Sequence, residues 1–313
     1  MKIVFFGTAN VALPILEKLN KQHTVLAVVT NPYAPSGRSG NPQESPVSFL
    51  AKDLKLALFK PEKVKGNADF FEQLKSLNAD IFVVVAYGKI LPLEIINLPP
   101  LKTVNVHFSV LPKYRGPSPI QFALLSGDAQ TGTSIFILDE NVDEGLLLAQ
   151  KIVDIEPDDN FFTLSDKLAK ISADLILETL LDYQLGKITP LPQDQARATF
   201  TKMISKLDGK IDWQKSSGEI YNMFRAFFLW PGIWTTWNGK KVKITDCHTT
   251  ELQIQNTTNT YGCGHVLDGG VVVCGNGTFL QIKSLQLEGK NETDVNSFLN
   301  GYEAFVGSTF GIL

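Results

Sequence analysis

Short β-branched runs alternate with helical patterns over the first 155 residues, and closely spaced short strands follow a Pro-rich segment. These patterns predict an α/β chain with a Rossmann-like, mostly parallel sheet and helices on both faces, followed by a small OB-like β-barrel domain. The length of 313 residues fits about two domains. With 44% hydrophobic and 19% charged residues the chain can bury a core, which excludes a disordered protein.

The expected strands of the first part are apolar runs of strand length, and helices are expected between them. The strands are Ile3–Phe6, Val25–Val29, Leu56–Phe59, Ile81–Val85, Thr103–Val106, Ser134–Leu138 and Leu147–Ile152. The helices include Val11–Asn20, Val47–Leu54 and Phe70–Leu77. Because ligands of such sheets bind beyond the carboxyl ends of the strands, the loops that follow them are the places to look for a site.

A long helical stripe closes the first part of the chain. It begins at Thr163, a residue type that caps helices, and ends at Gly186. Residues 189–205 contain several Pro and Gln and lack sustained periodicity, so they are expected to form a linker. The predicted domains are therefore 1–188, an α/β domain, and 206–313, a barrel domain.

The second domain is expected to open with a helix at Ser217–Phe227 and to continue with short strands between Gly or Asn turns. These strands are Ile233–Trp237, Val242–Thr245, Leu252–Gln255, Gly264–Leu267, Val271–Cys274 and Phe279–Ser284. Trp213 and Trp230 are expected to pack in the core rather than stack on bases.

Charge and cysteine usage restrict the class of protein. The net charge of −3 gives no overall basic field, so nucleic-acid binding would need a local site. The three cysteines form no CxxC pair, and no metal site is expected. The apolar run before Gly7 is too short for a signal peptide or a membrane span, so we expect a cytoplasmic protein without a membrane partner.

The first predicted strand ends in Gly7 and Thr8, where a dinucleotide-binding fold would place its glycine-rich turn. The G-x-G-x-x-G spacing is absent, which disfavours NAD binding. A tight turn that needs glycine explains Gly7, although a backbone amide there can also hold a small anion or a substrate carboxylate.

Polar side chains follow the strand at Thr103–Val106. Asn105 and His107 are two residues apart, so both side chains point to the same side of the sheet. A carboxylate-rich loop follows another predicted strand, and four of its residues compete for a role beside the histidine: Asp139, Glu140, Asp143 and Glu144. An amide, an imidazole and a carboxylate without a Ser or Cys nucleophile suit direct transfer of an acyl group to an amine.

The alternative is that His107 is a hydrogen-bonded core residue and Asn105 a turn former. From the residues alone, the chain is interpreted as a small-molecule group transferase.

The region around Asn105 and His107 resembles the folate-dependent formyltransferases through the run NVHFSVLPKYRGPSP at 105–119. Further matches are the Phe6-Gly7-Thr8 turn, the run VVAYGKILP at 84–92 and Val142-Asp143-Glu144-Gly145. Later matches are KLDGKIDW at 206–213, Arg225-Ala226-Phe227 with Trp230-Pro231-Gly232, and LQLEGK at 285–290, so the resemblance covers nearly the whole chain.

The resemblance implies that Asn105, His107 and Asp143 form the catalytic set and that 10-formyltetrahydrofolate is the formyl donor, with no metal. The amine would attack the formyl carbon directly, Asn105 and His107 would stabilise the oxyanion, and Asp143 would orient His107. The implied folate-binding residues are Tyr87, Gly88, Ile90, Leu91, Ser109, Leu111, Pro112, Leu138 and Asp139. The implied substrate-binding residues are Gly7, Thr8, Arg38, Lys113 and Arg115.

The resemblance further implies an acceptor, the amino group of methionine on initiator tRNA, and hence a role in translation initiation. A 4-amino sugar nucleotide is the alternative acceptor, and a non-catalytic folate- or RNA-binding protein is a third possibility. In members that act on tRNA, loop 33–46 is basic. Here its only charged residues are Arg38 and Glu44, which favours the sugar nucleotide as acceptor. The signatures at 206–213 and 225–232 favour the tRNA and weigh more.

Two further features bear on the predicted site. Phe108 stands where the family usually has a small residue, so the pocket wall is expected to differ. Residues 206–313 carry nine Lys or Arg against ten Asp or Glu, so any basic face there must come from geometry. A monomer is expected.

Overall fold

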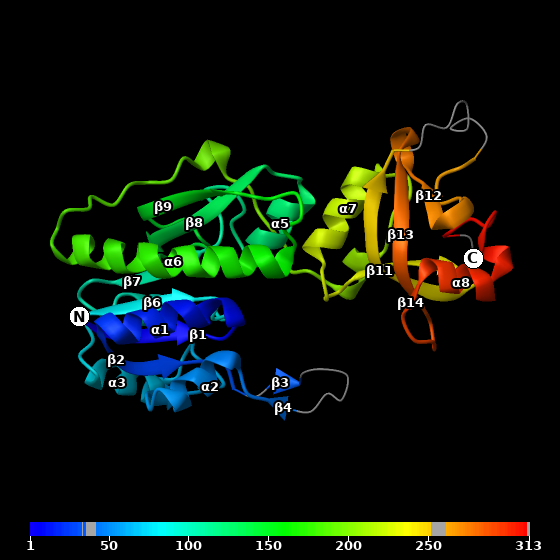
Figure 1. The fold of residues 1–313 in the computed structure, drawn as a ribbon. Helices are drawn as coiled ribbons and strands as arrows, with labels where there is room; N and C mark the ends of the chain where they lie inside the picture. The colour runs from blue at the N-terminus through cyan, green and yellow to red at the C-terminus, as the bar shows by residue number, and fades with distance from the viewer. Residues whose placement is uncertain (33, 36–41, 252–260, 312–313) are drawn as a thin grey trace. The chain divides into compact units, whose positions relative to one another are not determined.

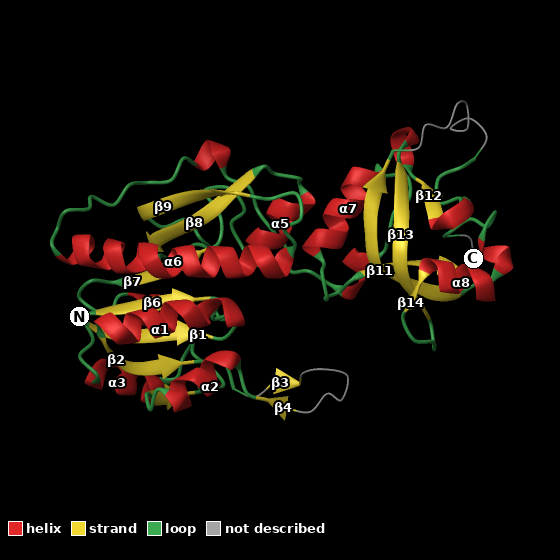
Figure 2. Ribbon diagram, in the orientation of Figure 1, coloured by secondary structure: helices red, strands yellow, loops and turns green. Residues whose placement is uncertain are grey.

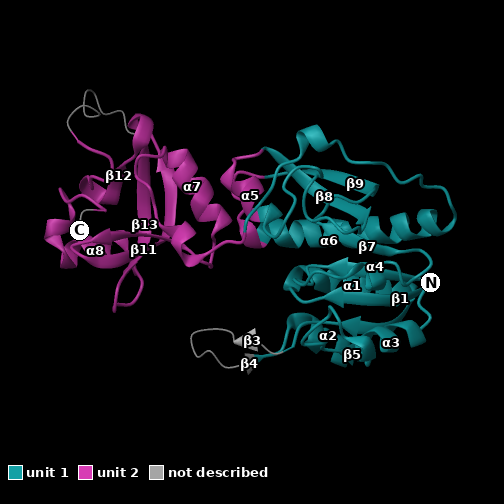
Figure 3. Cartoon of the chain, turned by 180° about the vertical axis from the view of Figure 1, so that it is seen from behind, with its two compact units in different colours: residues 1–120, 129–155, 163–202 teal, residues 121–128, 156–162, 203–313 magenta. Residues whose placement is uncertain are grey.

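The computed structural model describes residues 1–32, 34–35, 42–251 and 261–311. The chain divides into two compact units, shown in Figure 3, and each is described by itself. Unit 1 comprises residues 1–120, 129–155 and 163–202, and unit 2 comprises residues 121–128, 156–162 and 203–313.

Unit 1 is built on a seven-stranded sheet with the order β5-β2-β1-β6-β7-β8-β9 (Figure 1). The first five strands in this order run parallel, and β8 and β9 are added antiparallel to β7 and to each other. The bounds are β1 (Lys2–Gly7), β2 (Thr24–Val29), β5 (Ala57–Phe59), β6 (Ile81–Val85), β7 (Thr103–His107), β8 (Gln130–Ile137) and β9 (Leu147–Asp154). The predicted mostly parallel sheet is confirmed.

The helices of unit 1 follow the strands as the alternating pattern predicts (Figure 2). They are α1 (Leu13–Gln22), α2 (Pro46–Asp53), α3 (Ala68–Ser76), α4 (Leu93–Ile96), α6 (Phe161–Gln184) and the short turns η1 (Asn10–Ala12) and η2 (Gln195–Arg197), with β3 (Ala34–Pro35) and β4 (Pro42–Gln43) as a small ribbon. Ser45 caps α2 and Asn67 caps α3 by accepting backbone hydrogen bonds. The long helix α6 begins two residues before Thr163, and Asn160 accepts from the amide of Phe162 at its start.

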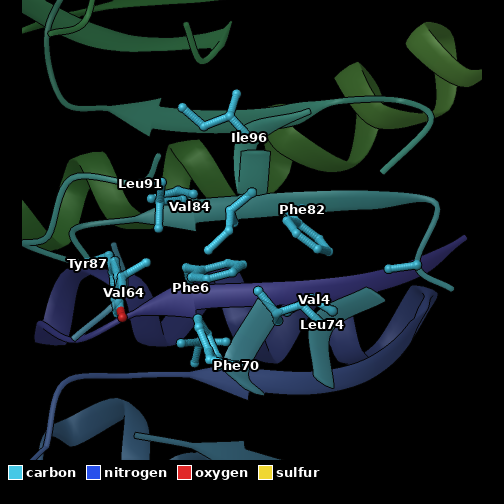
Figure 4. Packing of buried hydrophobic residues seen from close by; sticks show 13 residues of the cluster. Val4, Phe6, Val64, Phe70, Leu74, Phe82, Val84, Tyr87, Leu91 and Ile96 are labelled. Carbon is cyan, nitrogen blue, oxygen red and sulfur yellow. The ribbon is translucent and has the colours of Figure 1, made fainter. Parts of the chain in front are cut away.

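The core explains why the strands are apolar on both sides. One face of the sheet carries Val4, Phe6, Phe82 and Val84 (Figure 4). Phe70 and Leu74 of α3 pack on this face. Phe6 meets the rings of Phe82 and Tyr87 at centroid distances of 5.4 and 5.5 Å. The alternate residues of β1, Ile3 and Phe5, are also fully buried, so both faces of the central strand are covered.

Unit 2 contains a five-stranded antiparallel sheet with the order β10-β11-β13-β12 and β14 paired to β13. The bounds are β10 (Ile233–Trp237), β11 (Lys240–Thr250), β12 (Val271–Val273), β13 (Phe279–Leu287) and β14 (Thr293–Asp294). Its helical elements are η3 (Lys206–Gly209), α7 (Ser217–Ala226), η4 (Asp268–Gly270), η5 (Gly275–Gly277), α8 (Val295–Gly301) and η6 (Glu303–Phe305), and α5 (Pro119–Leu125) lies largely in this unit. A capping box of Ser216 and Glu219 starts α7.

Three expectations for unit 2 need correction or lie outside the structure. Residues 264–267 form isolated bridges instead of the expected strand. Trp213 packs in the core as expected, stacked on Phe310 at 5.2 Å, but Trp230 is 53% exposed and the prediction for it is wrong. The strand expected at 252–255 lies outside the described residues.

The segment expected to be a linker belongs in part to unit 1. Leu191 pairs with Leu147 of β9, and Thr199 and Thr201 exchange backbone hydrogen bonds with Arg115. These backbone hydrogen bonds attach residues 191–201 to β9 and to the loop that follows β7.

The described residues contain neither a membrane-spanning helix nor a cluster of metal-binding side chains. No helix among them is long and apolar enough to cross a membrane. They also hold no group of three or more His, Cys, Asp or Glu side chains placed to bind a metal ion.

Replacing Phe6 with Ala removes a fully buried ring and leaves a cavity between Phe82 and Tyr87. We expect a loss of about 3–5 kcal/mol in the free energy of unfolding, measured in urea. Phe49 on α2 is 57% exposed, so Phe49→Ala is the matched control and should change this free energy by less than about 0.5 kcal/mol. Equal losses in the two variants would contradict the assigned core.

Candidate active site

Asn105 and His107 lie at the carboxyl end of β7, on the same side of the sheet as their spacing predicts. β7 runs between β6 and β8, with Asn105 beside Val84 and His107 beside Ser134. Asn105 is half-buried and His107 is buried. Two rigid neighbours therefore fix the strand from which both side chains project.

The imidazole of His107 lies between a carbonyl and a carboxylate. Its Nε2 is 2.9 Å from the carbonyl oxygen of Tyr114, and because a carbonyl only accepts, Nε2 carries a hydrogen in this contact. Its Nδ1 is 3.5 Å from Asp143 Oδ2, an ion-pair distance longer than an ordinary hydrogen bond. His107 and Asp143 therefore lie close enough for their charges to interact, but a direct hydrogen bond between them requires a closer approach. Donation from Nε2 to a substrate requires the Tyr114 contact to open.

Asp143 is placed by the loop between β8 and β9. Its Oδ2 accepts a hydrogen bond of 2.7 Å from the amide of Gly116, and its φ of +55° lies in the left-handed region that Asp tolerates. Two residues later Gly145 passes so close to β8 that a Cβ atom would lie 1.7 Å from the carbonyl oxygen of Ile137. Glycine at this position lets the loop close onto the strand end and bring Asp143 to His107.

Among the four competing carboxylates, the structure distinguishes the one at the histidine. Asp139 accepts from the amide of Asn141 within its own loop, Glu144 pairs with Arg115, and Glu140 is exposed. Within the described residues, Asp143 is the carboxylate at ion-pair distance from His107.

Arg115, a predicted substrate contact, has its side chain enclosed by unit 1. It is fully buried, and its Nη1 donates to Glu144 at 2.9 Å and to Gln195 at 2.8 Å. Its Nε and Nη2 both donate to Gln193 Oε1, at 3.1 and 2.8 Å. A guanidinium enclosed in this way supports the loops.

The residues that sequence reasoning missed are Gln193, Thr199 and Thr201, all within the expected linker. Thr199 Oγ1 accepts from the amide of Tyr114, and Thr201 Oγ1 accepts from that of Ser118. Gln193 binds Arg115 and the Asp143 loop at once. Polar residues in a segment without periodicity give no signal in one sequence that would separate them from solvated loop residues.

The loop after β6 exposes some of its predicted folate contacts and buries others. The side chains of Tyr87 and Leu91 belong to the core, and burial raises the pKa of the Tyr87 phenol to about 12. Ile90 is 83% exposed, and Gly88, with a φ of +80°, is also exposed. Thr8 donates through Oγ1 to the carbonyl oxygen of Tyr87, so the turn after β1 supports this loop.

The predicted contacts at 109–113 and 138–139 also divide by burial. Ser109 Oγ donates to the carbonyl oxygen of Lys113, Leu111 is buried, and the carbonyl oxygen of Pro112 accepts from the amide of Thr199. The partly buried residues are Leu138 and Asp139. Lys113 is exposed, with its ammonium 4.7 Å from the centre of the Tyr114 ring.

The turn at Gly7 is tight for a plain steric reason. A Cβ atom on this residue would meet the Phe5 ring at 2.7 Å and the carbonyl oxygen of Val85 at 3.2 Å. Arg38, the predicted substrate contact in loop 33–46, lies outside the described residues.

Comparison with known proteins defines the class. Residues 1–180 match the family model "Formyl transferase" and residues 203–303 match "Formyl transferase, C-terminal domain". The chain therefore belongs to the formyl transferase family. It is 41% identical over 306 residues to "Methionyl-tRNA formyltransferase" of Caldicellulosiruptor saccharolyticus, covering 97% of each chain. It is 37% identical over 303 residues to the protein of that name from Listeria monocytogenes, covering 96% of this chain and 95% of the relative.

Solved structures share the fold at lower identity. An N-formyltransferase from Helicobacter canadensis, in complex with folinic acid and dTDP-3-aminofucose, matches with a TM-score of 0.65 and 19% identity. The match covers 90% of this chain and 98% of that one. HypX from Aquifex aeolicus, in complex with tetrahydrofolic acid, matches with a TM-score of 0.64 and 16% identity, over 98% of this chain and 48% of that one.

Gly116 supplies the amide that holds Asp143, and its φ of +105° is one that residues with a side chain rarely adopt. A Cβ atom there would also lie 2.9 Å from both Thr201 O and Thr201 Oγ1. Gly116→Ala should therefore reduce the free energy of unfolding in urea by about 2 kcal/mol or more.

Gly186 is the matched control, because its φ is +67° and a Cβ atom would meet nothing within 4 Å. Gly186→Ala should reduce the same free energy by about 1 kcal/mol. A Gly116 variant as stable as the Gly186 variant would argue against the close approach of Thr201.

Proposed function

We propose that this chain transfers a formyl group from 10-formyltetrahydrofolate to the free amino group of methionine on initiator methionyl-tRNA, for translation initiation. The chemistry is supported by one observation above all, the placement of Asp143 Oδ2 3.5 Å from His107 Nδ1 beside Asn105. The acceptor is supported by the likeness to methionyl-tRNA formyltransferases at 37–41% identity along nearly the full length.

The reaction requires a nucleophilic amine, a stabilised oxyanion and a path for one proton. The amine nitrogen attacks the formyl carbon and gives a tetrahedral intermediate, whose oxyanion Asn105 stabilises by donating from its side-chain amide. The pair of Asp143 and His107 takes the proton that the amine loses. The bond from the formyl carbon to N10 of the folate then breaks, and N10 takes up a proton.

We place the folate against the loops after β6 and β8. Ile90 and Val142 expose 83% and 56% of their surface and offer apolar cover to a flat ring system. Gly88, Leu138 and Asp139 present backbone groups there, and the buried predicted residues support the loops from behind. The latter are Tyr87, Leu91, Ser109 and Leu111, while Pro112, also predicted, is half-buried.

For the acceptor, we propose that Gly7 and Thr8 border the amino-acid end and that the exposed Lys113 meets a phosphate near the reacting amine. We assign tRNA binding to residues 206–313. There Lys241 Nζ lies 4.2 Å from the centre of the Trp234 ring, and a bridge joins Lys210 to Trp234. Arg38 stays a proposed contact of the same acceptor.

The deciding experiment measures formyl transfer from 10-formyltetrahydrofolate to methionyl-tRNA, with a 4-amino sugar nucleotide as a parallel acceptor. We expect efficient transfer to the tRNA that weakens as salt rises, because phosphate contacts release counterions. Transfer to the sugar alone would keep the chemistry and overturn the acceptor. Transfer to neither would overturn the proposal.

Asp143→Asn keeps an oxygen to accept from Gly116 but removes the negative charge beside His107. We expect kcat for formyl transfer to fall by about 10²–10⁴-fold, while the free energy of unfolding changes by about 1 kcal/mol or less. Rapid quench and urea titration measure the two quantities.

Glu140→Gln is the matched control, since Glu140 is an exposed carboxylate of the same loop. Its kcat should stay within about threefold of the unaltered protein, as for surface changes away from the site. The opposite pattern, a silent Asp143 variant and an impaired Glu140 variant, would reassign the catalytic carboxylate.

A further inference from the structure

Gln193 lies in the segment between the two predicted domains, outside every motif that carries the family resemblance. Its side chain is buried, with 6% of its surface exposed, and it belongs to unit 1. We propose that Gln193 is a positioning residue of the formyl transfer, which holds Asp143 at His107 without touching either substrate. This inference rests on the proposed function and extends it.

Gln193 contacts the loop that carries Asp143. Gln193 Nε2 donates to two carbonyl oxygens, those of Asp143 and Gly145, each at 2.9 Å. These carbonyls belong to the residue that pairs with His107 and to the glycine that closes the loop onto β8. The amide therefore ties down the loop at two points, one on each side of Glu144.

Arg115 fixes the orientation of the Gln193 amide. Its Oε1 accepts from Arg115 Nε and Nη2, at 3.1 and 2.8 Å, and a guanidinium has donors only. The reversed amide would set its own NH₂ against those donors and leave two carbonyl oxygens facing an acceptor. Arg115 thus forces Gln193 to present its N–H groups to the Asp143 loop.

Asp143 is held both at its backbone carbonyl and at its carboxylate. Gln193 holds its backbone carbonyl, while the amide of Gly116 holds its carboxylate at 2.7 Å. The second contact comes from the neighbour of Arg115, the residue that orients Gln193. Since Asp143 has a φ of +55°, a local conformation of low intrinsic stability, these outside contacts keep it in place.

His107 depends on the same short segment as Asp143, residues 114–116. Its Nε2 contacts the carbonyl oxygen of Tyr114, the residue before Arg115. The two members of the catalytic pair are therefore set by one support, and Gln193 is the part of it that reaches across to the Asp143 loop. Loss of its donors should displace the carboxylate and leave the imidazole in place.

The test uses Gln193→Glu, which keeps the acceptor for Arg115 and the shape of the side chain but removes both donors to the loop. The matched control is Gln195→Glu, the same change two residues on. Gln195 accepts from Arg115 Nη1 at 2.8 Å and, within the described residues, binds none of the loop carbonyls that Gln193 holds.

We expect Gln193→Glu to lower kcat for transfer to methionyl-tRNA by about 10- to 100-fold, the effect of misplacing a reacting group by about 1 Å. KM for the tRNA should change by less than about threefold, because Gln193 does not touch the acceptor. Gln195→Glu should leave kcat within about threefold of the unaltered protein.

A double-variant cycle separates positioning from general support. If Gln193 acts through Asp143, Gln193→Glu should lower kcat by less than about threefold in a background that already carries Asp143→Asn. A full additional loss in that background would overturn the proposal, as would a Gln193 variant with unaltered kcat. Gln193→Met, which buries no charge, is measured alongside and must show the same kcat loss and the same lack of additivity.

The unaltered protein distinguishes the two possible failures. If it transfers no formyl group to methionyl-tRNA, the proposed function fails. If it does so and the Gln193 variants match it, the positioning role fails while the function stands.

Discussion

The guanidinium of Arg115 carries a positive charge into the interior of unit 1, and much of the structure around the site follows from accommodating it. A buried charge is tolerated only when it is paired and its hydrogens are accepted. Glu144, Gln193 and Gln195 supply these acceptors, and they come from two segments distant in sequence. The charge therefore draws the loop after β7, the Asp143 loop and residues 191–201 together.

This arrangement gives a physical reason for the position of the His107–Asp143 pair. The neighbours of Arg115 on each side contact the pair directly, through the carbonyl of Tyr114 to His107 and the amide of Gly116 to Asp143. The parallel strands deliver Asn105 and His107 to the sheet edge, but the carboxylate reaches them from an antiparallel connection between β8 and β9. Sheet topology alone would leave the carboxylate unplaced, and the Arg115 network places it.

The sequence predicted the strands of unit 1 well, because continuous apolar runs between glycine and polar turns leave few alternatives to a buried strand. It predicted Asn105 and His107 for the same reason, since strand periodicity determines which side chains share a face. It did not choose among Asp139, Glu140, Asp143 and Glu144, because their position depends on the close approach of Gly145 to β8. The family resemblance named Asp143, and the distance to His107 fits that choice.

Arg115 and Trp230 both depart from the burial that their residue types predict. Arginine favours the surface and tryptophan the core, yet Arg115 is fully buried and Trp230 is half-exposed. Residue type gives a preference for surface or interior, and for Arg115 its hydrogen-bond partners override that preference. Gln193 shows the same limit, since a glutamine in a Pro-rich segment becomes a structural contact only when a distant arginine lies opposite it.

We propose that the end of β7 and the Asp143 loop together bind and activate the formyl group. A crystal structure of this chain with 5-formyltetrahydrofolate, which resembles the donor, tests it most directly. We expect the pterin to lie against the loops after β6 and β8, with Asn105 Nδ2 about 3 Å from the formyl oxygen or from a water in its place. A folate bound away from Asn105, with Asp143 turned from His107, would contradict it.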